Sequence, residues 1–198
     1  MNITSLSSSH VNHVVEIHLR AFPDFFLSFL GPRFLREFYA SFLSDSQGMG
    51  YIASAPDGQI LGVIVGSVDS QGYFKRLLKR RWWAFCLASI PAVLKRPSCI
   101  PRLFRAIFYR GESPADPKRA LLSSIAVDPD FKGAGIGKKM VMHWMEDVHR
   151  RGATGCFLTT DADNNEGVNA FYRNLNWHIE STYSTPQGRR MNRYIYDF

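Results

Sequence analysis

Acidic residues are missing from a long internal stretch of this 198-residue chain. Residues 70–111 contain no Asp or Glu but ten Lys and Arg. Because the whole chain carries a formal charge of +7, the remainder carries −3. The positive charge therefore belongs to one segment, and it does not predict a nucleic-acid partner for the protein as a whole.

Cysteines are few and scattered: Cys86, Cys99 and Cys156, with no CxxC spacing. This pattern predicts neither a disulfide framework nor a metal site, and it favours a reducing, cytoplasmic location. The first residues also lack the basic region and apolar stretch of a secretion signal, so none is expected.

Long apolar runs are absent as well. The longest candidate, residues 82–94 (WWAFCLASIPAVL), has 13 residues, and we expect Pro91 to break any helix there. It is too short to span a bilayer core of about 30 Å. The basic, apolar segment 71–111 leaves three interpretations open. The first is a helical hairpin that covers a sheet edge or forms a homodimer contact. The second is a peripheral anchor, in which residues 73–110 bind the anionic inner face of a membrane. The third is a lid over a phosphorylated acceptor.

Apolar residues make up 45% and charged residues 21% of the chain, which is typical of one globular domain spanning residues 1–198. Hydrophobic periodicity predicts helices and strands in the order β-α-α-β-β-insert-β-α-β-α-β-β. This is an α/β (α+β) mixed sheet with helices on both faces and a helical insertion between the third and fourth strands. Predicted helices cover 10–21, 31–43, 135–151 and 165–175, and predicted strands cover 2–6, 48–55, 59–68, 119–127, 156–160, 177–183 and 190–196.

A glycine-rich turn, Lys132–Lys138 (KGAGIGK), follows the strand that ends at Asp128-Pro129 and opens an amphipathic helix. It lacks the GxxxxGK[ST] spacing of a Walker loop. Free backbone N–H groups at a helix N-terminus form an anion site, and glycines let a phosphate approach them closely. The turn alone therefore predicts phosphate binding without saying which phosphate.

Three motifs together resemble the GNAT (Gcn5-related) N-acetyltransferase superfamily. Residues 132–137 match its [QR]-x-x-G-x-[GA] signature with Lys in the first place, and residues 125–129 (IAVDP) match its AVxP strand end. Residues 165–177 match its N-x-x-A-x-x-L-Y-x-x-x-G-F pattern, with Val168, Asn176 and Trp177 as departures. Asn176 stands where the pattern has glycine, and asparagine tolerates the left-handed backbone conformation better than most residues.

The resemblance implies the GNAT fold and acetyl-CoA as co-substrate, with no metal. The turn amides would hold the pyrophosphate, the strand end would pair with the pantetheine arm, and an N–H near Val127 would polarise the acetyl carbonyl. The implied binding residues are Ile125, Ala126, Val127, Lys132, Gly133, Ala134, Gly135, Ile136, Gly137, Lys138, Asn165 and Tyr172.

Tyr172 is the implied general acid, because the family places a tyrosine of this helix beside the CoA sulfur. The family's base usually lies on the fourth strand, yet residues 121–127 contain no carboxylate or imidazole. The base therefore stays unassigned, with His18, Asp24 and Ser123 as weak candidates and a water chain as the other route. Thr159, Thr160, Asp161 and Asp163 are expected near the floor of the cleft. Strict alternation would place Leu121, Ser123 and Ile125 on one face of the strand.

The resulting prediction is a transferase that moves an acetyl group from acetyl-CoA to a primary amine. The aromatic segment 22–31 and the basic insert favour a small acceptor such as an amino sugar or sugar nucleotide. A protein amine, on lysine or at an N-terminus, is the alternative acceptor. A CoA-binding regulatory module without turnover is the alternative of another class, supported by the missing base.

Overall fold

The computed structural model describes residues 1–100, 116–186 and 188–198. The strands are β1 (Asn2–Ser5), β2 (Gly48–Ser54), β3 (Ile60–Ser67), β4 (Arg119–Val127), β5 (Gly155–Asp161), β6 (His178–Ser184) and β7 (Arg190–Asp197). The helices are α1 (Val11–Ala21), α2 (Phe26–Leu30), α3 (Pro32–Ser44), α4 (Ser70–Lys95), α6 (Ile136–Arg150) and α7 (Glu166–Arg173).

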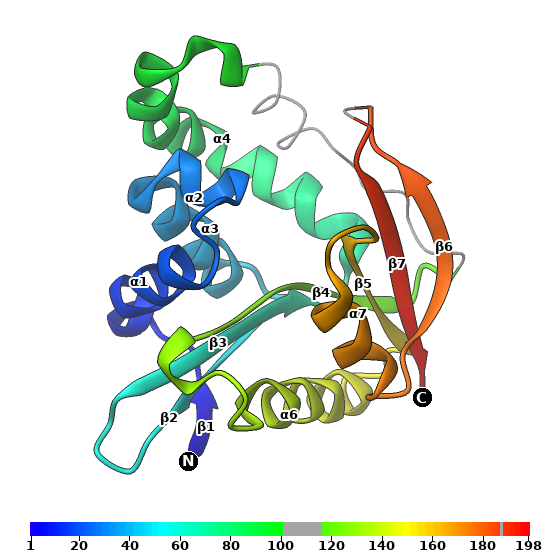
Figure 1. The fold of residues 1–198 in the computed structure, drawn as a ribbon. Coiled ribbons are helices and arrows are strands. Elements are labelled where there is room, and N and C mark those ends of the chain that lie inside the picture. Colours follow the sequence, from blue (N-terminus) through cyan, green and yellow to red (C-terminus); the bar gives the residue numbers. More distant parts are fainter. Residues whose placement is uncertain (101–115, 187) are drawn as a thin grey trace.

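Seven strands form one mixed sheet in the order β1-β2-β3-β4-β5-β7-β6. Every neighbouring pair is antiparallel except β4 and β5, which run parallel. Helices α1 to α4 lie on one side of the sheet and α6 on the other, with α7 near β5 (Figure 1). The mixed α/β prediction is therefore confirmed.

Each face of the sheet has its own apolar core. On one face, Val14 of α1 and Leu35 and Phe42 of α3 pack against Val63 and other sheet residues. On the other face, α6 contributes residues spaced three or four apart, which is the period that keeps side chains on one side of a helix. These are Ile136, Met140, Val141, Trp144, Met145 and Val148.

Glycine, proline and asparagine stand at turns whose backbone conformations other residues adopt less readily. Gly31 has φ 89° and Pro32 occupies the first turn of α3, a position where its missing N–H costs nothing. Asn176 has φ 63°, so it does adopt the left-handed conformation in place of glycine. The five-residue helix α2 was not predicted, because segment 22–31 is too aromatic to show a helical period.

The expectation that Pro91 breaks the insert helix was wrong. Helix α4 runs for 26 residues and contains Pro91 four residues before its end. Pro91 is exposed, so the carbonyl group left without a partner one turn earlier can bond to water. In the described part of the insert, α4 packs on α2 and α3 through Phe34, Phe85 and Ala88, and a short 3-10 helix, Pro97–Cys99, follows it. Residues 101–111 of the predicted insert lie outside the described residues.

Strict alternation along β4 was also wrong. Gly66 pairs with Leu122, but the next residue back, Val65, pairs with Ser124, so Ser123 is an extra residue in a β-bulge. Because of this extra residue, the alternation of side chains between the two faces of the sheet is inverted after the bulge. Leu122 before it and Ile125 after it both face the α6 core, while Ala126 faces α1 and α3.

Candidate active site

The parallel strands β4 and β5 separate part-way along their length. They pair only at Arg119–Gly155, Ala120–Cys156 and Leu121–Phe157. Beyond Leu121, β4 continues for six residues to Val127 on β3 alone, and β5 continues on β7. The backbone of both strands is therefore open to a ligand along the facing edges of this split.

Register shows which β4 groups face the split. The N–H of Asp128 donates to the carbonyl of Leu61 at 2.8 Å, so Asp128 belongs to a hydrogen-bonded pair with β3. Bonded and non-bonded pairs alternate in antiparallel strands, so Ile125 and Val127 direct their N–H and C=O groups away from β3. The IAVDP strand end thus directs the N–H and C=O groups of Ile125 and Val127 toward the split.

The glycine-rich turn lies at the end of this open edge. Gly133 and Gly135 have φ 87° and 74°, a conformation that costs other residues about 1 kcal/mol or more. Gly135 directly precedes α6, whose first amides have no earlier helical turn to donate to. Lys132, Gly133, Ala134, Gly135 and Lys138 are exposed, and a Cβ on Gly137 would lie 3.6 Å from Phe171 Cζ, so α7 borders the turn.

Helix α7 brings the second half of the predicted CoA site to the split. Asn165 precedes its first residue and donates through Nδ2 to Thr160 Oγ1 at 2.8 Å and to the carbonyl of Asp161 at 3.1 Å. Both acceptors lie at the end of β5. In this structure Asn165 fixes the β5–α7 turn, a role that the motif alone did not reveal.

Tyr172 lies inside the molecule beside the rings of Trp177 and Tyr194. Only 4% of its surface is exposed, and burial raises the pKa of its phenol. The hydroxyl therefore stays protonated at neutral pH. It can donate a proton or a hydrogen bond but cannot act as a base there.

Asn169, one turn before Tyr172, is a buried residue that the sequence did not single out. Its Nδ2 donates to the carbonyls of Asp161 and Asn165, at 3.1 and 2.9 Å. Its Oδ1 accepts from Tyr194 at 2.9 Å and from Asn192 at 3.1 Å. This network ties α7 to β5 and β7, and so holds Tyr172 in place.

Among the candidate bases that lie outside β4, His18 is connected to that strand through hydrogen bonds. Its Nδ1 lies 2.8 Å from the Tyr39 hydroxyl, and Tyr39 in turn hydrogen-bonds to Ser124, the residue after the bulge. His18 Nε2 is buried and has no hydrogen-bond partner in the described chain. Burial lowers the pKa of His18 to about 4, so the imidazole is neutral at pH 7.

The other candidates have weaker connections. Asp24 is exposed in the turn between α1 and α2. Ser123 is the bulge residue itself, and Thr160 is used by Asn165. Asp161 and Asp163 form ion pairs with Arg189 and Arg190 at 2.7 and 3.0 Å, which reduces their availability as bases.

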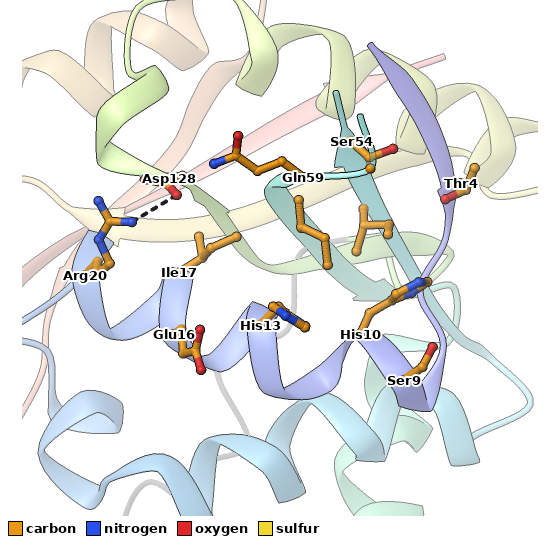
Figure 2. Close-up of a pocket in the computed structure, with 13 residues that line it drawn as sticks. Thr4, Ser9, His10, His13, Glu16, Ile17, Arg20, Ser54, Gln59 and Asp128 are labelled. Carbon is orange, nitrogen blue, oxygen red and sulfur yellow. Dashed lines mark hydrogen bonds and ion pairs between the residues drawn. The ribbon is translucent and has the colours of Figure 1, made fainter. Parts of the chain in front are cut away.

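A hollow of about 590 Å³ lies elsewhere, between α1 and strands β1 to β3 (Figure 2). Within the described chain, none of the predicted catalytic or CoA residues lines it. At its edge, Arg20 of α1 donates to Asp128 at 3.0 Å and to Asp130 at 2.7 Å. Asp128 also accepts from the N–H of Asp130, so this ion pair fixes the turn that leads into the glycine-rich segment.

The described residues contain no group of three or more His, Cys, Asp or Glu that could hold a metal ion. Nor is any helix among them both long and apolar enough to cross a membrane.

A family model for the acetyltransferase (GNAT) family matches residues 11–177, which is most of the chain. The chain belongs to the acetyltransferase (GNAT) family. The matched segment runs from α1 to the residue before β6, and it includes the β4–β5 split, the glycine-rich turn and α7.

Among curated GNAT relatives, [ribosomal protein bS18]-alanine N-acetyltransferase of Escherichia coli (strain K12) is 33% identical over 75 residues. That alignment covers 35% of this chain and 49% of the relative. The chain thus spans about half the length of the curated relatives it matches.

Solved GNAT structures share the fold over a longer span. Naa20 of Chaetomium thermophilum, in complex with a bisubstrate analogue, has a TM-score of 0.63 at 15% identity, covering 100% of this chain and 87% of that one. A Bacillus anthracis structure in complex with acetyl coenzyme A has a TM-score of 0.53 at 15% identity, covering 81% and 68%. At these identities the likeness concerns the fold alone.

Proposed function

We propose that this protein transfers an acetyl group from acetyl-CoA to a primary amine. The observation that carries the proposal is the split between β4 and β5. It leaves the N–H and C=O groups of Ile125 and Val127 directed away from β3, and it leads to the exposed glycine-rich turn that precedes α6. An elongated donor with a pyrophosphate at one end and amides along its arm fits this arrangement.

Each part of the split has a role in holding such a donor. The amides of Gly133 to Lys138, with the positive end of the α6 dipole, would bind the pyrophosphate. Lys132 and Lys138 add positive charge, although an ammonium lacks the planar, bidentate geometry of Arg. Ile125 and Val127 would pair with the pantetheine amides as a short added strand. When bound, acetyl-CoA supplies the activated acetyl group.

The residues around the reacting end provide polarisation and a proton. The N–H of Val127, which points away from β3, would donate to a developing oxyanion. Tyr172, a phenol that is protonated at neutral pH, is the general acid that we assign to the departing thiolate. Asn169 and Tyr194 hold Tyr172 indirectly, by fixing α7 against the sheet.

For the base, burial and a lowered pKa both argue against His18. An imidazole of pKa about 4 is a weak proton acceptor at neutral pH, because its protonated form is then present at only about one part in a thousand. We therefore assign His18 a positioning role, in which it orients Tyr39 and Ser124 next to the bulge. The acceptor amine would lose its proton to water before attack.

The acceptor that we propose is a small amine, of which an amino sugar or sugar nucleotide is the candidate from the sequence. Phe25, which directly precedes α2, and Phe29, which lies on it, are exposed and offer ring faces to such a ligand. The sequence match to an enzyme named for ribosomal protein alanine supports a second candidate, an N-terminal protein amine.

A thiol-release assay tests the proposal. The purified chain is incubated with acetyl-CoA and a panel of amines: free and nucleotide-linked amino sugars, polyamines, and peptides with N-terminal alanine. Release with one class identifies the acceptor, and Tyr172→Phe should reduce it. If acetyl-CoA binds but no amine causes release, the CoA-binding module is favoured. If acetyl-CoA does not bind, the donor assignment is wrong.

A further inference from the structure

Helix α4 has apolar residues on two opposite faces. The inner face, with Tyr73, Phe85, Ala88 and Ala92, packs against α2 and α3. Trp83, Leu87, Ile90 and Leu94 repeat at the i, i+4, i+7, i+11 spacing that places side chains in one line along a helix. We call these four residues the α4 stripe.

The α4 stripe is exposed. The exposed fractions are 56% for Trp83, 57% for Leu87, 46% for Ile90 and 77% for Leu94, and adjacent Trp82 is 58% exposed. At 1.5 Å per residue the stripe is about 16 Å long. The C-terminal end of α4 is far from the sheet (Figure 1). A line of large apolar side chains in water is unfavourable and marks an interaction surface.

Charge around the stripe indicates which partner it fits. Lys79 and Arg80 lie exposed one turn before it, Lys95 and Arg96 lie exposed directly after it, and residues 70–96 contain no acidic residue. Trp and aliphatic side chains flanked by Lys and Arg suit the boundary between lipid headgroups and acyl chains. Anionic headgroups attract each nearby basic side chain.

We propose that the α4 stripe and its flanking basic residues bind the surface of an anionic phospholipid bilayer. The helix would lie in the plane of the membrane, with its inner face still packed on α2 and α3. This inference concerns the location of the protein and holds whichever amine it acetylates.

Native tryptophan fluorescence can report this contact directly. Of the four tryptophans, Trp144 and Trp177 are buried, whereas Trp82 and Trp83 are exposed. Vesicles of two parts phosphatidylcholine to one part phosphatidylserine should shift the emission to shorter wavelength and protect it from acrylamide. Pure phosphatidylcholine and high salt should weaken both effects.

The double variant Leu87→Glu with Ile90→Glu should lower the vesicle partition coefficient at least about tenfold. Met142→Glu with Ile179→Glu is the matched control, because these apolar side chains are exposed to a similar degree on α6 and β6. It adds the same charge and should leave the vesicle-specific blue shift in place. Should the stripe variant fail to fold, Lys79→Gln with Arg80→Gln tests the same surface through charge alone.

Three results would overturn the proposal. The first is that the unaltered chain does not bind anionic vesicles. The second is that both double variants weaken vesicle binding equally. The third is sedimentation showing self-association of the chain that the stripe variant abolishes, without vesicle binding, which would assign the stripe to a second copy of the protein.

Discussion

Replacing His18 with Asn should remove a pH-dependent loss of stability without removing the hydrogen bond to Tyr39. The Asn side-chain amide can take the place of Nδ1, which lies 2.8 Å from the Tyr39 hydroxyl. Unlike imidazole, it has no proton to gain between pH 4 and 7. The variant therefore separates the titration of His18 from its packing.

The size of the effect follows from the shifted pKa. Burial lowers the pKa of His18 to about 4, against 6.5 in an unfolded chain. Between those values the unfolded state binds more protons, so the free energy of unfolding falls as pH falls through that window. From pH 7 to pH 5, this single group should reduce it by about 2 kcal/mol.

Carboxylates should not obscure this window. Burial alone would favour neutral Asp45 and Asp69, but hydrogen bonds from Arg76 and the backbone outweigh it and lower both pKa values. Their stabilisation is present above the unfolded value of 3.8 and is lost only below it. The stabilisation that these two carboxylates contribute is therefore lost at a lower pH than the stabilisation that His18 contributes.

Urea unfolding, followed by circular dichroism at half-unit steps from pH 5 to 7, measures the effect. The unaltered chain should lose about 2 kcal/mol more than His18→Asn across this range. Parallel curves would refute the reasoning, because they would mean that His18 titrates equally in both states. Any constant offset between the two curves would report the packing change alone, separately from their difference in slope.

Three further predictions concern the site itself. Tyr172→Phe should lower kcat about a hundredfold with little change in KM for acetyl-CoA, measured by thiol release, because only proton donation is lost; an unchanged kcat would exclude Tyr172 as the acid. Gly135→Ala, at φ 74°, should raise the acetyl-CoA Kd about tenfold, measured by calorimetry. Its control is Gly58→Ala in the β2–β3 hairpin, which at φ 89° should carry similar strain and leave Kd unaltered. Equal effects of the two substitutions on Kd would argue against a phosphate role for the turn. Asn169→Leu should cost about 2–4 kcal/mol of unfolding free energy in urea, because it removes the amide oxygen that accepts from Asn192 Nδ2 and from the Tyr194 hydroxyl in a buried network. A loss below about 1 kcal/mol would show that water replaces the amide.

Local patterns were enough to predict most of the elements. Helical and strand periods, with Gly and Pro as punctuation, placed β4 at its observed bounds and α6 within one residue at each end. The resemblance to the GNAT family followed from motifs of a few residues each, and the family match confirms it. These features depend on neighbours in the chain, so the sequence carried them.

The tertiary structure decided what depends on distant residues. The bulge at Ser123 arises from pairing with β3, and it determines that Ser124 hydrogen-bonds to Tyr39, which in turn bonds to His18. The β4–β5 split depends on where two strands stop pairing, which no local period encodes. Pro91 stays helical because α2 and α3 support α4 from one side.

The sequence by itself therefore determined the family, the order of elements and the turn expected to bind phosphate, because these follow from local motifs and periods. Only the tertiary structure decided that His18 is buried and neutral, that Asn169 holds α7, and that α4 exposes an apolar stripe. Burial is a property of what packs against a side chain, and that packing comes from segments far apart in the sequence.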